Sequence, residues 1–193
     1  MIRVAVLGDT HVPSDYPAIP ARVLEALAGS DAILHCGDIV HPGVLELLSA
    51  YAPVWAIAGN HDRGKPGMPL PRRRVVELGG RRIGMIHGDE VGGVHVTKSM
   101  VIELLHQAVL EPFIAEDPCD CIVFGHAHKP MVDVYRVTFE PQGPEAARVK
   151  HNVLLLNPGS PTSQTRVASM GFLYLTEGEL RAEIRLFQRQ GRK

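Results

Sequence analysis

Cysteine, aromatic residues and net charge are all scarce in this sequence of 193 residues. The three cysteines, Cys36, Cys119 and Cys121, include no C-x-x-C pair, so the sequence predicts neither a disulfide framework nor a zinc ribbon. The 20 Lys and Arg residues nearly balance the 21 Asp and Glu residues. This balance removes the electrostatic attraction typical of proteins that bind nucleic acid or anionic membranes. These features favour a reducing compartment and a small partner.

Long hydrophobic runs are also missing from the start of the chain. The segment MIRVAVLGDTH has one Arg, a short apolar run and then Asp and His, which fits neither a signal peptide nor a membrane span. We therefore expect a cytoplasmic protein with no membrane contact. Hydrophobic residues make up 45% of the chain and charged residues 21%, which suits one domain over residues 1–193 with a single core.

The order of apolar segments predicts an α/β fold. Short apolar runs that stop at Gly are typical of buried strands, and they occupy 2–7, 32–36, 53–58, 82–87 and 120–124. Residues 17–29 and 42–50 carry Leu, Val and Ala at helical spacing, each with a Pro near its start. A hairpin over 74–87 and a helix over 97–116 follow. Further strands at 131–139, 151–156, 170–176 and 180–187, with a loop at 140–147, predict a second sheet.

Each of the buried runs is followed by Gly together with Asp, Asn or His. The segments are Gly8-Asp9-Thr10-His11, Gly37-Asp38, Gly59-Asn60-His61-Asp62, His87-Gly88-Asp89 and Gly125-His126-Ala127-His128. Polar residues at strand ends point into the crevice outside a sheet, so we expect these loops to meet at one site. Burying several carboxylates and imidazoles together is costly unless a cation accompanies them. Asp, His and Asn without a thiolate suit Mn²⁺, Fe or Zn²⁺, and this many ligands suit two ions.

Any one of these motifs is compatible with a turn or a helix cap, whereas all of them in this order are specific. The series D-x-H, G-D, G-N-H-D, H-G and G-H-x-H resembles the calcineurin-like metallophosphoesterase superfamily. The later segment Asn157–Pro161 is similar to the small prokaryotic, phosphodiesterase-like branch. The resemblance implies a β-sandwich flanked by helices on both sides, in four layers α-β-β-α.

The resemblance also implies a role for each motif residue. One ion would be bound by Asp9, His11 and His128, the second by Asn60, His87 and His126, and Asp38 would bridge the two. His61 would contact the phosphate and protonate the leaving oxygen, with Asp62 orienting it. The implied reaction is hydrolysis of a phosphate ester by in-line attack of a hydroxide that bridges the ions. Mn²⁺ is the favoured metal, and Fe, Zn, Ni and Co are the alternatives.

The motifs narrow the substrate without identifying it. We favour a small phosphodiester, with a phosphomonoester as the alternative. A phosphoprotein is disfavoured because Gly37–Gly43 lacks the Asp-Arg pair of the protein phosphatase branch. A non-catalytic scaffold, as in the retromer subunit that resembles this family, is disfavoured because His61 and every predicted ligand are present. A nuclease is disfavoured by the neutral charge. The resemblance leaves a homodimer open, since small relatives are often dimeric.

Several other residues receive no catalytic role at this stage. The run Arg72-Arg73-Arg74 is more typical of a solvated strand start than of a phosphate site. Most of the remaining histidines are interpreted as structural or surface residues: His35, His41, His95, His106 and His151. Asn157–Pro161 is interpreted as a loop near the crevice. Asp89 stands where relatives often have another His, so this position can alter the choice of substrate.

Overall fold

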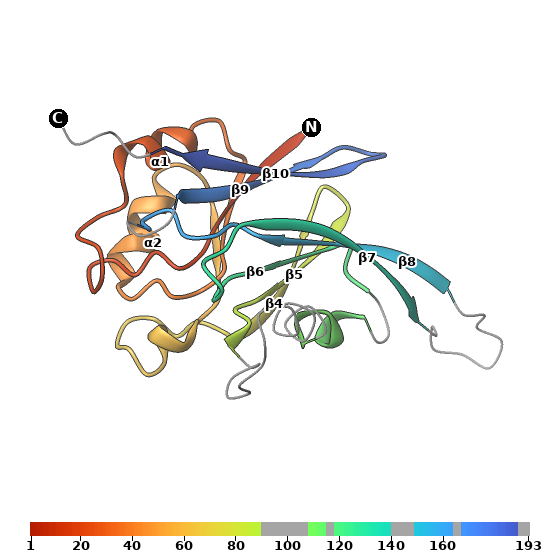
Figure 1. The fold of residues 1–193 in the computed structure, drawn as a ribbon, viewed down its shortest axis with the longest axis horizontal. Coiled ribbons are helices and arrows are strands. Elements are labelled where there is room, and N and C mark those ends of the chain that lie inside the picture. The colour runs from red at the N-terminus through yellow and green to blue at the C-terminus, as the bar shows by residue number, and fades with distance from the viewer. Residues whose placement is uncertain (90–107, 115–117, 140–148, 164–166, 189–193) are drawn as a thin grey trace.

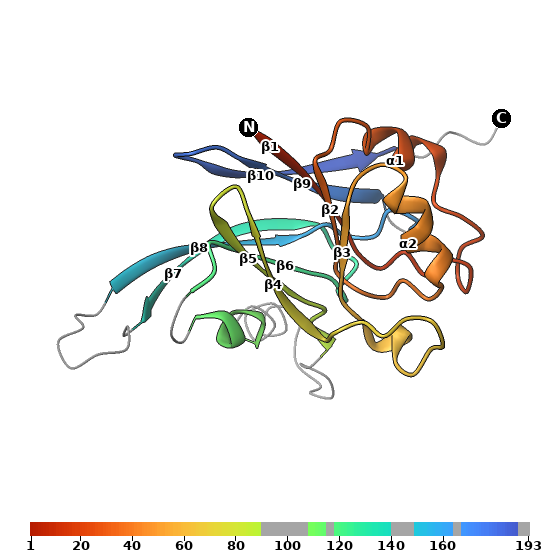
Figure 2. The same cartoon turned by 180° about the vertical axis from the view of Figure 1, so that it is seen from behind.

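The protein is described here by a computed structural model that covers residues 1–89, 108–114, 118–139, 149–163 and 167–188. Two five-stranded sheets pack face to face, as Figures 1 and 2 show from opposite sides. Helices lie outside this sandwich. Among the described residues, no helix is long and apolar enough to cross a bilayer.

The first sheet has the strand order β10-β9-β1-β2-β3. Its parallel strands are β1 (Ile2–Leu7), β2 (Ala32–His35) and β3 (Val54–Ala56). Helices α1 (Ala21–Ala26) and α2 (Pro42–Ser49) connect them, and β9 (Ala168–Leu175) and β10 (Leu180–Phe187) add an antiparallel edge. A short 3-10 helix, η1 (Asn60–Asp62), follows β3. The predicted β-α-β-α-β order is therefore confirmed.

The second sheet has the order β4-β5-β6-β8-β7. The hairpin β4 (Arg73–Leu78) and β5 (Arg81–Ile86) is antiparallel, whereas β5, β6 (Cys121–Phe124) and β8 (Val149–Asn157) run parallel to one another. Strand β7 (Met131–Phe139) pairs antiparallel with β8 at the edge. The predicted hairpin and second sheet are thus present. The predicted loop 140–147 lies outside the described residues.

Three hydrophobic clusters explain the layers. Along β1, Val4 and Val6 point into the cluster between the sheets, while Ala5 and Leu7 point into the cluster under α1 and α2. This alternation buries both faces of the strand, which explains its continuous apolar run. The third cluster lies on the outer side of the second sheet, where residues 108–110 and η3 (Glu111–Phe113) pack. The predicted four-layer order α-β-β-α is confirmed.

The helices are shorter than predicted. α1 begins at Ala21 because Pro20 is its N-cap in extended backbone, and the helical spacing of 17–29 includes turns on either side of it. Most of the predicted helix 97–116 lies outside the described residues.

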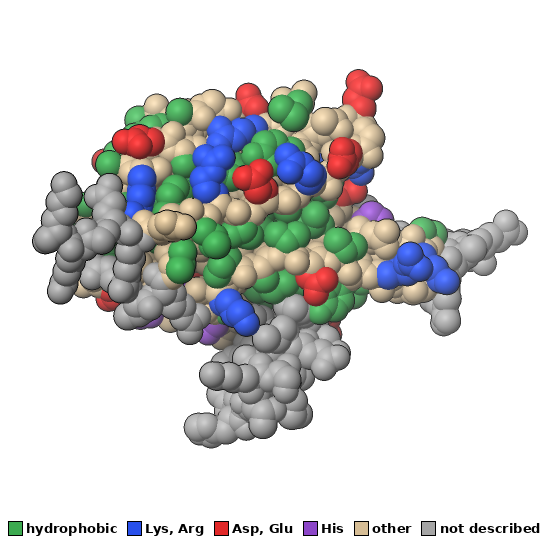
Figure 3. Space-filling model, turned by 45° about the horizontal axis from the view of Figure 1, so that its top comes forward, with side chains coloured by type: hydrophobic (Ala, Val, Ile, Leu, Met, Phe, Trp, Pro, Cys, Tyr) green, Lys and Arg blue, Asp and Glu red, His purple; other side chains and the backbone are tan. Residues whose placement is uncertain are grey.

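On the face drawn in Figure 3, Lys and Arg side chains are interspersed with Asp and Glu side chains. The described residues of this face therefore form no basic surface.

Candidate metal centre

The five predicted loops do meet at one end of the sandwich. The Asp9 amide donates to the Gly37 carbonyl at 3.0 Å, and the Gly125 amide donates to the His87 carbonyl at 3.0 Å. The His126 amide donates to Asp9 Oδ1 at 3.0 Å, which joins the loop after β6 to the loop after β1. Carboxyl ends of strands from both sheets therefore supply a single site.

The backbone at this site is strained at the predicted ligands. Positive φ angles occur at Asp9 (52°), His11 (48°), Asp38 (55°), His126 (65°) and His128 (51°). This left-handed region is unfavourable for L-residues other than glycine. Strained residues persist where the surrounding structure fixes them, and they gather at functional sites. The strain thus falls on five of the seven predicted ligands, and Val40 (78°) is the one other non-glycine residue among the described residues with a positive φ.

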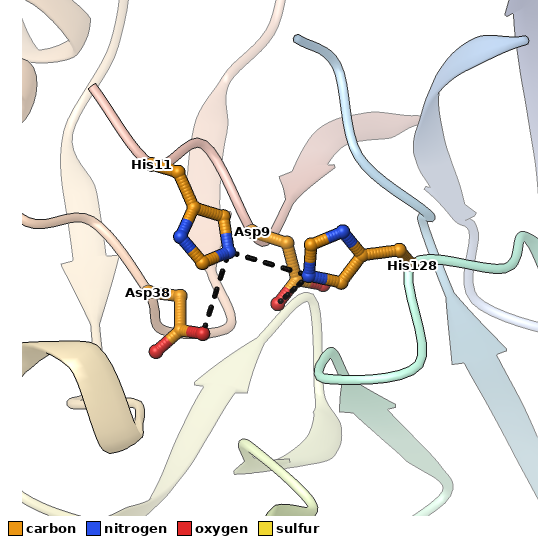
Figure 4. A group of neighbouring side chains, drawn as sticks. All are labelled: Asp9, His11, Asp38 and His128. Carbon is orange, nitrogen blue, oxygen red and sulfur yellow. Dashed lines mark hydrogen bonds and ion pairs between the residues drawn. The ribbon is translucent and has the colours of Figure 1, made fainter. Parts of the chain in front are cut away.

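Four of the predicted ligands form one compact group, drawn in Figure 4: Asp9, His11, Asp38 and His128. One ligand atom from each lies within 4.8 Å of all the others. His11 Nε2 lies 3.2 Å from His128 Nε2 and 3.5 Å from Asp38 Oδ2. His128 Nε2 also lies 3.5 Å from Asp9 Oδ1. The side chains come from three loops and point toward one another (Figure 4).

The chemistry of this group fits a divalent cation. Asp9 is fully buried, and its Oδ2 has no hydrogen-bond partner among the described residues. Burial raises the pKa of Asp9 to about 7, and burial likewise lowers the pKa of His11. An ion bound between these groups would neutralise the carboxylates and give the facing imidazole nitrogens a shared partner. The oxygen and nitrogen donors match the ligand set predicted from the sequence.

A second group shares Asp38 with the first. Asp38 Oδ2 lies 3.3 Å from His87 Nε2, in addition to its 3.5 Å approach to His11 Nε2. His87 Nε2 lies 3.1 Å from Asn60 Oδ1, and the His126 ring packs edge-on against the His87 ring with centroids 5.3 Å apart. The structure therefore brings all seven predicted ligands to one place, with Asp38 between the two sets.

Hydrogen bonds prepare His87 and Asp38 as ligands. His87 Nδ1 donates to the Cys36 carbonyl at 2.7 Å, which leaves Nε2 facing Asn60 and Asp38. Burial alone would raise the pKa of Asp38, but the hydrogen bond and charge of His87 hold that pKa well below its usual range. Asp38 is therefore an anion near neutral pH.

His61 occupies the exposed rim of the centre. Its side chain is 52% exposed, and its Nε2 lies 4.0 Å from Asp38 Oδ2. Its backbone amide donates to Asp38 Oδ1 at 2.9 Å, and its ring stands edge-on to the His11 ring, with centroids 4.8 Å apart. His61 is thus beside the metal ligands and open to a substrate.

Asp62 has a different set of partners from the one expected. Its buried carboxylate accepts the amides of Ile39 at 3.0 Å, Val40 at 2.7 Å and Gly59 at 2.9 Å. The expected contact with the His61 ring is not among the hydrogen bonds of the described residues. Asp62 is the third residue of η1, where its side chain caps the amide of Gly59, and the other two amides belong to the loop that carries Asp38. It positions that loop.

A buried polar network behind the ligands was not predicted. Ser160 Oγ donates to the Asp9 carbonyl at 2.8 Å, and Thr162 Oγ1 donates to the Thr10 carbonyl at 2.9 Å. Thr10 Oγ1 also lies 3.2 Å from Nε2 of fully buried His35. The one available signal was the polar segment after β8, which repeats the pattern of the other strand ends.

Comparison with known proteins assigns the family. Residues 2–178 match the calcineurin-like phosphoesterase superfamily domain. A probable metallophosphoesterase from Methanothermobacter thermautotrophicus is 32% identical over 161 residues, which are 82% of this chain and 77% of that protein. The chain belongs to the calcineurin-like phosphoesterase superfamily, a family of metallophosphoesterases that bind divalent metals. The resemblance seen in the motifs is thereby confirmed.

Solved structures share the fold. Vps29 from Cryptosporidium parvum aligns with a TM-score of 0.61 at 21% identity, over 97% of this chain and 98% of that chain. Vps29 from Entamoeba histolytica, complexed with zinc, aligns with a TM-score of 0.59 at 23% identity, over 97% of this chain and 100% of that chain. These similarities confirm the two-sheet architecture.

Proposed function

We propose that this protein hydrolyses phosphate esters at a centre of two divalent ions, with phosphodiesters favoured over monoesters. The observation that carries the proposal is the position of Asp38 Oδ2, 3.5 Å from His11 Nε2 and 3.3 Å from His87 Nε2. A carboxylate that lies between two sets of ligand side chains is suited to joining two ions.

Each side of Asp38 would hold one ion. Asp9, His11 and His128 supply the first set of donors, and Asn60, His87 and His126 supply the second. When bound, the ions polarise the phosphoryl oxygens and lower the pKa of a bound water. Mn²⁺ is favoured by the oxygen and nitrogen donors, and Zn²⁺ is the first alternative because a Vps29 of the same fold was solved with zinc.

The remaining residues orient the ester and move a proton. The exposed ring of His61, 4.0 Å from Asp38, can reach an ester oxygen above the centre and protonate it as it leaves. Asp62 holds the loop of Asp38 through three backbone amides. Ser160 and Thr162 donate to the carbonyls of Asp9 and Thr10 in the loop after β1. These hydrogen bonds fix the loop that carries Asp9 before substrate binds.

A non-catalytic scaffold is the second candidate, because Vps29 chains share this fold over 97% of the present chain. The two candidate functions differ in the residues that they require at the metal centre. A scaffold needs neither the complete set of ligands nor a histidine at position 61, whereas this chain has both.

Hydrolysis assays test the proposal. Metal-stripped protein is given bis(p-nitrophenyl) phosphate or p-nitrophenyl phosphate, before and after addition of Mn²⁺. We expect diester turnover that requires Mn²⁺ and disappears in Asp38→Asn, which should bind fewer than two ions per chain. We expect His61→Ala to keep its metals and lose about 10²- to 10⁴-fold in turnover.

His151→Ala serves as the matched control, because His151 lies six residues before the site end of β8. This variant is expected to retain turnover. Preference for the monoester would redirect the substrate class. Absence of turnover of both esters in protein that holds two ions would contradict the proposal and favour the scaffold.

A further inference from the structure

A buried carboxylate holds two arginines next to the metal centre. The side chain of Asp89 is 5% exposed, and its two oxygens accept hydrogen bonds from Arg63 Nη2 and Arg72 Nη2, each at 2.5 Å. Burial alone would raise the pKa of Asp89, but the hydrogen bond and charge of Arg72 hold it below its usual value. Asp89 is therefore an anion that binds the guanidinium groups of Arg63 and Arg72.

The chain places this trio beside the second set of metal ligands. Arg63 directly follows η1, which contains Asn60 and His61, and Asp89 lies two residues after His87. Arg72 precedes β4, whose first residue pairs with the last residue of β5. Its Nη1 donates to the carbonyl of Ala58, just before the G-N-H-D motif, at 3.5 Å. The trio is thus built from the segments that flank the ligand loops.

The charges of the trio do not cancel. Two guanidinium groups face one carboxylate, so the trio carries one net positive charge. The two cations differ in access, because the Arg63 side chain is 59% exposed and the Arg72 side chain is 31% exposed. Asp89 fixes one edge of the Arg63 guanidinium, and among the described residues the other donors of that planar group have no hydrogen-bond partner, so they can bind an anion.

We propose that Arg63, seated by Asp89, recognises a second anionic group on the substrate, at a distance from the phosphate that is cleaved. The substrate class is then a phosphate ester whose organic part carries its own carboxylate or phosphate. This inference rests on the phosphoesterase function proposed above. Arg63 is a specificity residue, and Asp89 and Arg72 position it.

A matched pair of chromogenic diesters tests the inference. p-Nitrophenyl 3-carboxypropyl phosphate and p-nitrophenyl butyl phosphate have the same length and differ in one terminal carboxylate. With Mn²⁺ present, we expect wild-type kcat/KM to be about 5-fold higher for the carboxylate, the size of an accessible ion pair. Arg63→Ala should abolish this ratio, and Arg63→Lys should keep part of it.

Arg181→Ala is the control, because Arg181 is 55% exposed and lies on β10, near a single carboxylate of Glu183 at 3.9 Å. This variant should keep the wild-type ratio. A purely structural role for Arg63 would lower kcat/KM of both esters equally and leave the ratio unchanged, which would overturn the inference. Equal turnover of the two esters by the wild-type protein would also overturn it.

A binding measurement separates failure of the inference from failure of the proposed function. Calorimetric titration of the Mn²⁺-loaded protein with 4-phosphonobutyrate and with butylphosphonate needs no turnover. We expect tighter binding of 4-phosphonobutyrate, and loss of that advantage in Arg63→Ala. If neither ester is hydrolysed while this difference in binding holds, the hydrolytic function fails and the anion site stands. If the two phosphonates bind wild-type protein equally, the anion site fails.

Discussion

Replacement of Asp62 by Ala tests how the loop that carries Asp38 is held in place. Asp62 is 2% exposed, and its carboxylate accepts the backbone amides of Ile39, Val40 and Gly59 at 2.7 to 3.0 Å. All three donors are buried, so water cannot replace the lost acceptor without opening the loop. Asp62 therefore stabilises the fold and the metal centre together.

The size of the effect follows from these three bonds. A buried amide left without an acceptor costs about 1 to 3 kcal/mol, so the loss of three acceptors in Asp62→Ala should lower the free energy of unfolding of the metal-free protein by about 3 to 9 kcal/mol. Asp62→Asn keeps one acceptor oxygen but turns an amino group toward a donor, and about 2 kcal/mol is expected for its cost. Because Asp38 precedes Ile39, Mn²⁺ affinity should fall in both variants.

Urea unfolding of metal-free protein, followed by circular dichroism, measures the loss. Asp133→Ala is the matched control, because Asp133 accepts the Val134 amide at 2.8 Å on the exposed surface. The control should stay within about 0.5 kcal/mol of wild type. An Asp62→Ala variant within about 1 kcal/mol of wild type would refute the reasoning, since three buried amides cannot lose a charged acceptor so cheaply.

Three further predictions concern pH and steric fit. Burial raises the pKa of Asp9 to about 7 in the metal-free fold, and the carboxyl must lose its proton to bind an ion. Mn²⁺ affinity should therefore rise about tenfold per pH unit up to pH 7. A chelator competition in which Mn²⁺ affinity does not change with pH would contradict this. Burial lowers the pKa of His35 to about 4, so the unfolded chain takes up a proton at a higher pH than the folded protein does. The free energy of unfolding should therefore fall as the pH drops from 6.5 to 4. In thermal melting, the stability of His35→Gln should depend less on pH over this range. A Cβ at Gly59 would collide with Asp38 Oδ1, so Gly59→Ala should lower Mn²⁺ affinity more than tenfold in dialysis, whereas Gly178→Ala, with open space around it, should not.

The strands and the ligands were predictable because their signals are local. Apolar runs such as 2–7 and 120–124 are buried on both faces, and a strand of that kind ends where the chain must turn. The turn needs Gly, and the polar residue beside it faces the crevice. The positions of Asp38 and His87 follow from this rule once the strands are paired.

The supporting contacts were not predictable because they join segments that are distant in sequence. Ser160 reaches the carbonyl of Asp9 across 151 positions, and nothing in either segment specifies the other. Asp62 was expected to orient its neighbour His61, but the direction of its side chain depends on how η1 meets the Asp38 loop. His35 is fully buried, and its contact with Thr10 could not be foreseen from the sequence.

The number of Mn²⁺ ions that one chain binds tests the central claim most directly. Metal-stripped protein, dialysed to equilibrium against Mn²⁺ and measured by elemental analysis, should hold two ions per chain. The Asp38→Asn variant should hold fewer than two, because Asp38 Oδ2 lies within 3.5 Å of both sets of donors. Wild-type protein that binds fewer than two ions, or an Asp38→Asn variant that still binds two ions equally well, would contradict a two-ion centre joined by Asp38.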